Sequence, residues 1–129
     1  MRLINERTHG TIASIVELAV SRVDRRRGLL GRNGLDASAA LMLAPCAAVH
    51  TAFMRFTLDV VFVDRAGRVK KIVQGLAPWR MSASLGAYAA IELAAGGPRD
   101  LVLGDRLYLS GGEDVPLEAA VNTLSDGRA

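Results

Sequence analysis

Apolar residues in this chain fall into short runs, and almost every run ends at a glycine, a proline or a charged residue. Short apolar runs bounded by turn-forming residues are typical of β-strands, and they leave too few long helical segments for a doubly wound sheet. We therefore predict a mainly β fold with one or two short helices, built as a small β-sandwich or a partly closed β-barrel. The predicted strands cover residues 12–20, 41–43, 49–54, 60–63, 69–73, 88–93 and 107–109.

One predicted hairpin turn and one predicted helix carry clear local signals. Gly67, between two strands in the middle of the chain, supplies the positive φ that a hairpin turn needs near its end. Ser21 and Asp24 have the spacing of a capping box, so a helix is predicted to begin at Ser21 and to end at Gly31. Two further segments complete the prediction, a loop over residues 77–86 and a short, weakly packed helix over residues 116–124.

The composition fits a single globular domain. The chain has 129 residues, of which 50% are hydrophobic and 22% are charged. We expect one domain over residues 1–129, with its core at about residues 12–109 and a polar tail at residues 111–129. The single cysteine, Cys46, excludes an intrachain disulfide. The first residues lack the apolar segment of a signal peptide, and the longest uncharged stretch is rich in alanine. We therefore expect a soluble, cytoplasmic protein with no membrane partner.

Positive charge is concentrated near the start of the chain. Residues 1–32 contain seven arginines against three acidic residues. A solvated face explains such a cluster, and the alternative is a basic surface that docks on nucleic acid or on an acidic protein. Surfaces that bind single-stranded nucleic acid interleave basic with aromatic residues, and residues 1–32 contain no aromatic residue, so we expect no specific nucleic-acid partner. The surface in question is formed by Arg22, Arg25, Arg26 and Arg27.

Four short segments occur in an order and at spacings that are distinctive only in combination. They are Arg27-Gly28-Leu29-Leu30-Gly31-Arg32, then Phe53-Met54-Arg55 followed by residues 58–64, then residues 92–96, and finally Gly104-Asp105. Together they resemble the DUF192 family (domain of unknown function 192) over roughly residues 12–109. The chain departs from the family at Phe56, where many relatives carry asparagine, and at Leu30, where many carry methionine. The resemblance implies a compact, mostly β fold and no established activity.

Three charged residues lie in or beside the most apolar segments of the chain. Asp59 opens a predicted strand, Glu92 lies inside another, and Arg55 lies shortly before the first. A buried, unpaired carboxylate is costly, so each acid must find a partner or take up a proton. In the structural interpretation, Asp59 caps backbone amides or pairs with Arg55, and Glu92 pairs with Arg55 or Arg80. In the functional interpretation, the acids belong to a pocket that binds a ligand or moves a proton. Our hypothesis is that Asp59 and Glu92 approach each other from different strands, with Arg55 near both.

Cys46 and His50 are the remaining residues with chemical potential near the centre of the chain. Four residues of extended strand span roughly 13 Å, so the pair is too far apart for a thiol–imidazole couple. We interpret Cys46 as an inert core residue, and His50 as either a structural histidine or a member of the pocket. The two histidines have no ligand-spaced partners and no glycine motif has a nucleotide-binding context, so neither a metal nor a cofactor is predicted.

Trp79 and Arg80 form a candidate surface-binding pair in the predicted 77–86 loop, because Trp and Arg are common in binding hot spots. The alternative for Trp79 is a lid that closes one end of the barrel.

Three functions remain open from the sequence alone. The first is a binding or accessory module that holds a small molecule or a partner protein's polar group. The second is a small enzyme that uses Asp59 and Glu92 as acid and base, and the third is the basic surface described above. The absence of a recognised catalytic signature favours the first. Its candidate pocket is lined by His50, Met54, Arg55, Asp59 and Glu92.

Overall fold

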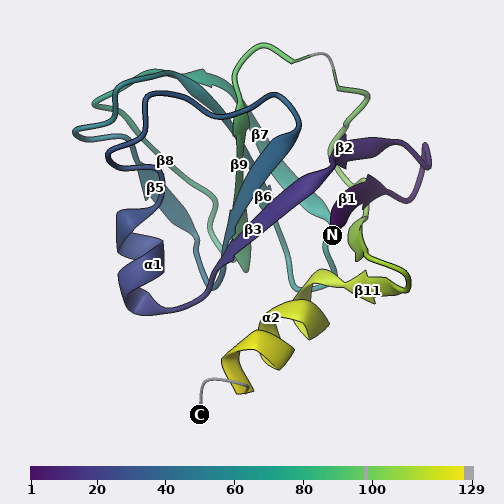
Figure 1. Ribbon diagram of the computed structural model, residues 1–129. Coiled ribbons are helices and arrows are strands. Elements are labelled where there is room, and N and C mark those ends of the chain that lie inside the picture. The colour runs from purple at the N-terminus through teal and green to yellow at the C-terminus, as the bar shows by residue number, and fades with distance from the viewer. Residues whose placement is uncertain (98, 127–129) are drawn as a thin grey trace.

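A computed structural model describes residues 1–97 and 99–126 of the chain, which form a mostly β structure with two short helices (Figure 1). The prediction of fold class is confirmed, since the sheets pack face to face in a sandwich-like arrangement. A five-stranded central sheet has the order β3 (Ile15–Ala19), β4 (Ala39–Leu43), β9 (Ala89–Ala94), β6 (Leu58–Val63) and β7 (Val69–Leu76). Within it β3 and β4 are parallel, and they are connected through helix α1 (Arg22–Arg27).

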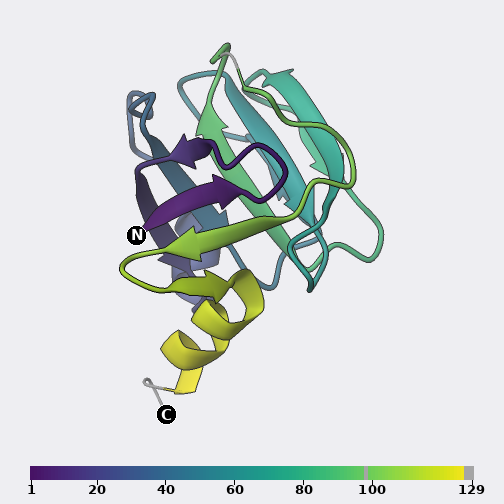
Figure 2. The same ribbon diagram turned by 90° about the vertical axis from the view of Figure 1, so that its right-hand side faces the viewer.

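Both faces of the central sheet are covered, which explains why all six residues of β6 are buried. One face packs against a four-stranded sheet and against helix α2 (Leu117–Asp126). The other face packs against the loop that follows α1 and against a two-stranded sheet of β5 (Ala48–His50) and β8 (Met81–Ala83). Figures 1 and 2 show the two coverings on opposite sides of the central sheet. The four-stranded sheet has the order β11 (Asp114–Pro116), β10 (Leu107–Ser110), β1 (Arg2–Asn5) and β2 (Thr11–Ala13).

The alternation of side chains along β6 and β9 separates the two buried acids. Asp59 lies opposite Leu93, on the face that the four-stranded sheet covers, whereas Glu92 lies opposite Val60, on the α1 face. Because successive side chains of a strand point to opposite faces, the two carboxylates lie on opposite sides of one sheet. The hypothesis that they approach each other is therefore wrong.

The hairpin of β6 and β7 is confirmed, including the role of Gly67. Its φ is 82°, and a β-carbon at this position would collide with the carbonyl oxygen of Leu107. Glycine is therefore required both by the turn conformation and by the close approach of β10.

The start of the helical region differs from the prediction in two ways. The strand predicted over residues 12–20 divides at Ser14 into β2 and β3, because the amides of Ser14 and Ile15 both donate to the carbonyl of Ser38. The side chain of Ser21 accepts from the Asp24 amide as predicted, at 3.1 Å. Helix α1 nevertheless ends at Gly28 rather than Gly31, because Gly28 has φ 47° and ψ −123°, which no helix continues.

Three segments outside the predicted strands also join sheets. β8 lies within the predicted loop 77–86, and β1 lies at the very start of the chain. The predicted polar tail supplies β11 and α2. Helix α2 lies where a helix over residues 116–124 was predicted, but it is not weakly packed, since its Leu117 is 1% exposed. The core thus extends beyond residues 12–109 at both ends, and α2 is packed into it.

Candidate functional site

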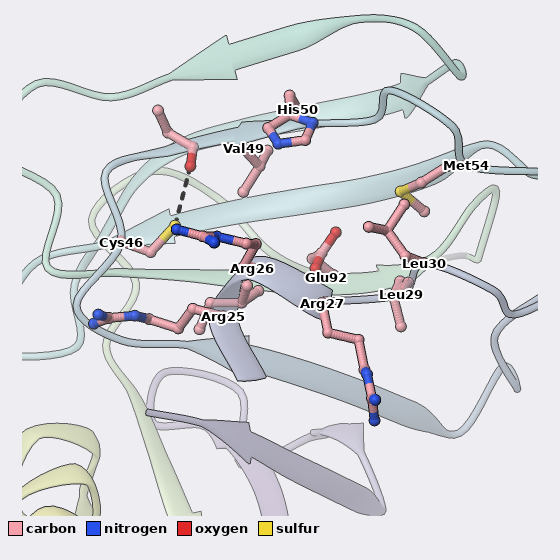
Figure 3. A pocket seen from close by; sticks show the side chains of 13 residues that line it. Arg25, Arg26, Arg27, Leu29, Leu30, Cys46, Val49, His50, Met54 and Glu92 are labelled. Carbon is pink, nitrogen blue, oxygen red and sulfur yellow. Dashed lines mark hydrogen bonds between the residues drawn. The ribbon is translucent and has the colours of Figure 1, made fainter. Parts of the chain in front are cut away.

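A small cavity of about 80 Å³ opens between the end of α1, the loop that follows it and strand β5 (Figure 3). Glu92 lies on the sheet side of this cavity, with Val49 and His50 across from it and Met54 at one end. The cavity is lined by Arg25, Arg26, Arg27, Gly28, Leu29, Leu30, Leu43, Cys46, Ala48, Val49, His50, Met54 and Glu92.

Glu92 is the chemically unusual member of this lining. It is 4% exposed, and it makes no hydrogen bond or ion pair with residues 1–97 or 99–126. No fully buried side-chain oxygen in that part of the chain lacks a partner, so the Glu92 oxygens keep contact with open space, which the cavity supplies. Burial raises the pKa of Glu92 to about 7, although the positive charge of Arg32 pulls it down. Near neutral pH the carboxyl group therefore exists in both protonation states.

Gly28 lies directly beside the Glu92 carboxyl group, and its positive φ is what favours glycine at this position. A β-carbon at Gly28 would lie 3.6 Å from Oε1 of Glu92, and the backbone conformation there is one that side chains rarely adopt. The chain thus turns directly above the carboxyl group, immediately after α1 ends. This turn belongs to the Arg27–Arg32 segment on which the family resemblance rests.

Three of the arginines of α1, Arg25, Arg26 and Arg27, lie along the helix side of the cavity. Nη1 of Arg25 donates to the carbonyl of Pro45 at 3.3 Å, which connects α1 to the loop before β5. Arg26 and Arg27 are exposed, and Figure 3 shows Arg27 pointing away from the cavity. The outer end of the cavity is consequently positive, while its inner end holds a carboxyl group.

Cys46 and His50 both line the cavity without forming a couple. The Cys46 thiol donates to the carbonyl of Ala48 at 3.1 Å, and burial raises its pKa. A raised pKa keeps a thiol protonated and poorly nucleophilic. His50 is exposed on the outer face of β5, opposite Met81 of β8.

Two residues of the predicted pocket lie elsewhere. Asp59 accepts from Arg99 Nη1 at 2.6 Å and from the amides of Gly75 and Gly96 at 2.9 and 3.3 Å. Arg55 is exposed, and its Nη1 donates to Asn33 at 2.9 Å. The expectation that Asp59 caps amides is correct, but its cationic partner is Arg99 rather than Arg55.

Of the five predicted pocket residues, the cavity therefore brings together three, His50, Met54 and Glu92. The pairing of Glu92 with Arg55 or Arg80 does not occur. Sequence reasoning missed Gly28 as a site residue, although its presence in the Arg27–Arg32 segment was a usable signal. The partnership of Asp59 with Arg99 had no signal, because Arg99 lies 40 positions later in an irregular segment.

Asp105 of the closing glycine-aspartate segment has a structural role. It is 5% exposed and accepts from Arg7 Nε at 2.7 Å, from Asn5 Nδ2 at 2.9 Å and from the Val102 amide at 2.9 Å. Its hydrogen bonds, with the Arg7 contact the largest, hold the pKa of Asp105 well below its usual range. This network fixes the end of β1 to the loop before β10.

The fold and the cavity define a small, mostly β protein in which a short arginine-rich helix covers a carboxyl group on the central sheet. The chain belongs to the DUF192 family, described as "Uncharacterized ACR", whose family model matches residues 4–109. No curated protein matches the chain. No helix within the described residues is long and apolar enough to cross a membrane.

Two solved structures share the fold. A protein of unknown function from Novosphingobium aromaticivorans is 21% identical, with a TM-score of 0.72 over 84% of each chain. A putative transcription regulator from Sinorhizobium meliloti is 24% identical, with a TM-score of 0.69, over 88% of this chain and 90% of that one.

Proposed function

We propose that this protein is a binding module whose site is the cavity beneath α1, where a small polar group of a ligand or partner protein meets Glu92. The observation that carries the proposal is a buried carboxyl group that faces open space without a partner among the described residues. Buried polar side chains in folded proteins nearly always have hydrogen-bond partners. A carboxyl group that lacks one inside the protein is suited to receive one from outside.

The chemistry of the cavity favours a particular kind of ligand group. A cavity of about 80 Å³ is small compared with the sites of drug-sized ligands, so it suits a compact polar group rather than a large ligand. Its inner end, at Glu92, favours a hydrogen-bond donor such as an amine or amide. Its mouth, beside Arg25 and Arg26, favours a carboxylate or phosphate group. The proposed ligand therefore has a donor at its inner end and a negative charge at its outer end.

The other two functions have less support. Asp59 and Glu92 lie on opposite faces of the central sheet, so they are not placed to act as acid and base on one substrate. Arginines of α1 line the cavity, so binding of a ligand's negative group would explain their positive charge as well as docking on nucleic acid would. The description "putative transcription regulator" applies to the Sinorhizobium meliloti protein. For this chain, the absence of a specific nucleic-acid partner stays a prediction.

The test uses β-alanine, which carries an ammonium and a carboxylate group, as the probe for NMR titration of the ¹⁵N-labelled protein. We expect saturable shifts of the amide signals of Gly28 and Val49, larger than those caused by methylammonium or acetate. The response should strengthen as pH rises through about 7, because the ionised Glu92 carboxylate pairs with the ammonium group.

Glu92→Gln should abolish the response, because a neutral side-chain amide cannot form an ion pair with the ammonium group. Glu118→Gln is the matched control. Glu118 lies on α2 and forms an exposed ion pair with Arg65, so this variant removes the same type of charge outside the cavity lining. Shifts that persist in Glu92→Gln, or the absence of any saturable shift, would contradict the proposal.

A further inference from the structure

Three large apolar side chains are exposed on the loop that follows β5 and on the segment where β8 begins. Phe53 is 74% exposed, Trp79 60% and Met81 72%. The rings of Phe53 and Trp79 contact each other edge to face, with their centroids 4.6 Å apart. We refer to these three residues as the aromatic platform. Clustered apolar side chains on a surface are typical of interaction sites, whereas isolated ones need no explanation.

The backbone holds both aromatic residues in an uncommon conformation. Phe53 and Trp79 have φ values of 65° and 63°, in the left-handed region that residues other than glycine rarely adopt. Such conformations persist where the surrounding structure fixes them, and they are concentrated at functional sites.

Thr51, which is fully buried, fixes both loops of the platform. Its carbonyl accepts from the amides of Met54 and Trp79 at 3.1 and 3.0 Å. Its hydroxyl accepts from the Arg80 amide at 2.8 Å and donates to the Ala77 carbonyl at 2.6 Å. The exposed rings are thus presented by a rigid, hydrogen-bonded frame.

The chain segments that form the platform carry positive but no negative charge. The two segments that form and border the platform, residues 46–58 and 69–91, contain two arginines and two lysines and no acidic residue. Arg80 lies directly between Trp79 and Met81, and Lys71 Nζ donates to Ala83 of β8 at 2.9 Å. Charge complementarity therefore selects an acidic occupant.

We propose that the aromatic platform docks an acidic segment of a partner protein, with one large apolar side chain of that segment seated against Phe53 and Trp79. Buried aromatic and arginine anchors dominate such interfaces. The hydrogen-bonded backbone fixes where the two contacting rings leave the surface, which suits one defined side chain, whereas a fluid anionic bilayer gains nothing from a fixed position. The inference goes beyond the cavity and does not depend on its ligand.

The experiment measures fluorescence polarisation of three sets of short, fluorescein-labelled peptides that lack tryptophan. Each peptide has one Phe or Leu, flanked by Asp and Glu, by Lys and Arg, or by Ser and Gly. We expect the acidic set to bind at least about tenfold more tightly than the other two, with affinity that falls as salt is added. Trp79 is the chain's only tryptophan, so a blue shift of its emission should accompany binding.

Trp79→Ala and Phe53→Ala should each weaken binding by about tenfold or more. Leu103→Ala is the matched control, because Leu103 is 65% exposed and lies outside both segments of the platform. Equal binding of the three sets, unchanged binding by Trp79→Ala, or platform-dependent binding to anionic phosphatidylserine vesicles without peptide binding would each overturn the proposal. Glu92→Gln should leave peptide binding unchanged and Trp79→Ala should leave the β-alanine response unchanged, which keeps the tests of the platform and the cavity separate.

Discussion

Asp59 and Glu92 are buried acids on neighbouring strands, yet their surroundings give them different chemistry. Asp59 has a guanidinium and two backbone amides as donors, so its negative charge is compensated. Glu92 has no such donor among the described residues, and burial raises its pKa to about 7. At the scale of single residues, Asp59 therefore stabilises the fold as an ion, whereas the ionised form of Glu92 is tolerated at a cost.

Glu92→Gln is expected to change the pH dependence of stability. The pKa of Glu92 is raised from 4.5 to about 7 on folding, so the folded state holds the proton more tightly than the unfolded state. The free energy of unfolding of the wild type should consequently fall as pH rises between these two values, by about 3 kcal/mol in total. The variant cannot ionise and should lack this part of the slope.

Urea unfolding at pH 4.5, 6, 7 and 8.5 provides the measurement, with both proteins studied at each pH. The variant should match the wild type at the lowest pH and exceed its stability at the highest. An identical slope in the two proteins would show that Glu92 is already ionised near its ordinary pKa and would remove the physical basis of the cavity's chemistry.

At the scale of elements, the pair of Asp59 and Arg99 holds several parts of the central sheet together. Asp59 lies near the start of β6 and receives the amide of Gly75 in β7. Arg99 reaches it from the segment after β9 and also donates to the Ala94 carbonyl at 2.6 Å. One buried carboxylate thus joins β6, β7 and the end of β9.

Arg99→Met is expected to destabilise the fold by about 3–5 kcal/mol, because it leaves a buried carboxylate without its cation. Arg55→Met removes an exposed arginine whose guanidinium donates to the side-chain amide of Asn33, so its effect should stay below about 1 kcal/mol. Chemical unfolding of both variants at neutral pH checks the difference. Equal losses of stability would mean that the Asp59 carboxylate does not depend on its Arg99 partner.

Elements governed by local signals were predictable, whereas long-range partnerships were not. Gly67 and the β-branched run before it specified the β6–β7 hairpin, and the Ser21 side chain specified where α1 begins. The end of α1 depends on the conformation of Gly28, which only the folded structure reveals, because Gly31 offered an equally good local stop signal. β1 and β11 are short, and their pairing with β10 exists only once distant segments meet, so no local pattern marks them.

At the scale of the whole molecule, the C-terminal segment is part of the core. Leu117, Ala120 and Val121 of α2 pack into the same apolar cluster as Leu3 of β1 and Leu109 of β10. Helix α2 therefore covers apolar surface that would otherwise face solvent, in contrast to the polar tail that composition suggested.

Leu117→Ala is expected to lower the free energy of unfolding by about 2–5 kcal/mol, because it leaves a cavity at a position that is 1% exposed. The exposed Leu103 offers the same substitution without a cavity, and Leu103→Ala should change stability by less than about 0.5 kcal/mol. Thermal melts followed by circular dichroism compare the two variants. A negligible effect of Leu117→Ala would mean that α2 is detached from the core in solution.

The pairing of β1 with β10 also determines when the chain can finish folding during synthesis. Arg2 lies opposite Ser110, so β1 cannot close its ladder with β10 until the chain has been made through residue 110. Until then the strands of the four-stranded sheet cannot cover their face of the central sheet, whose apolar residues stay open to water. Such incomplete chains are aggregation-prone and are bound by chaperones. The sandwich is consequently completed only after β10 and then α2 have left the ribosome, and a nascent chain that ends before β10 carries an unfinished sandwich.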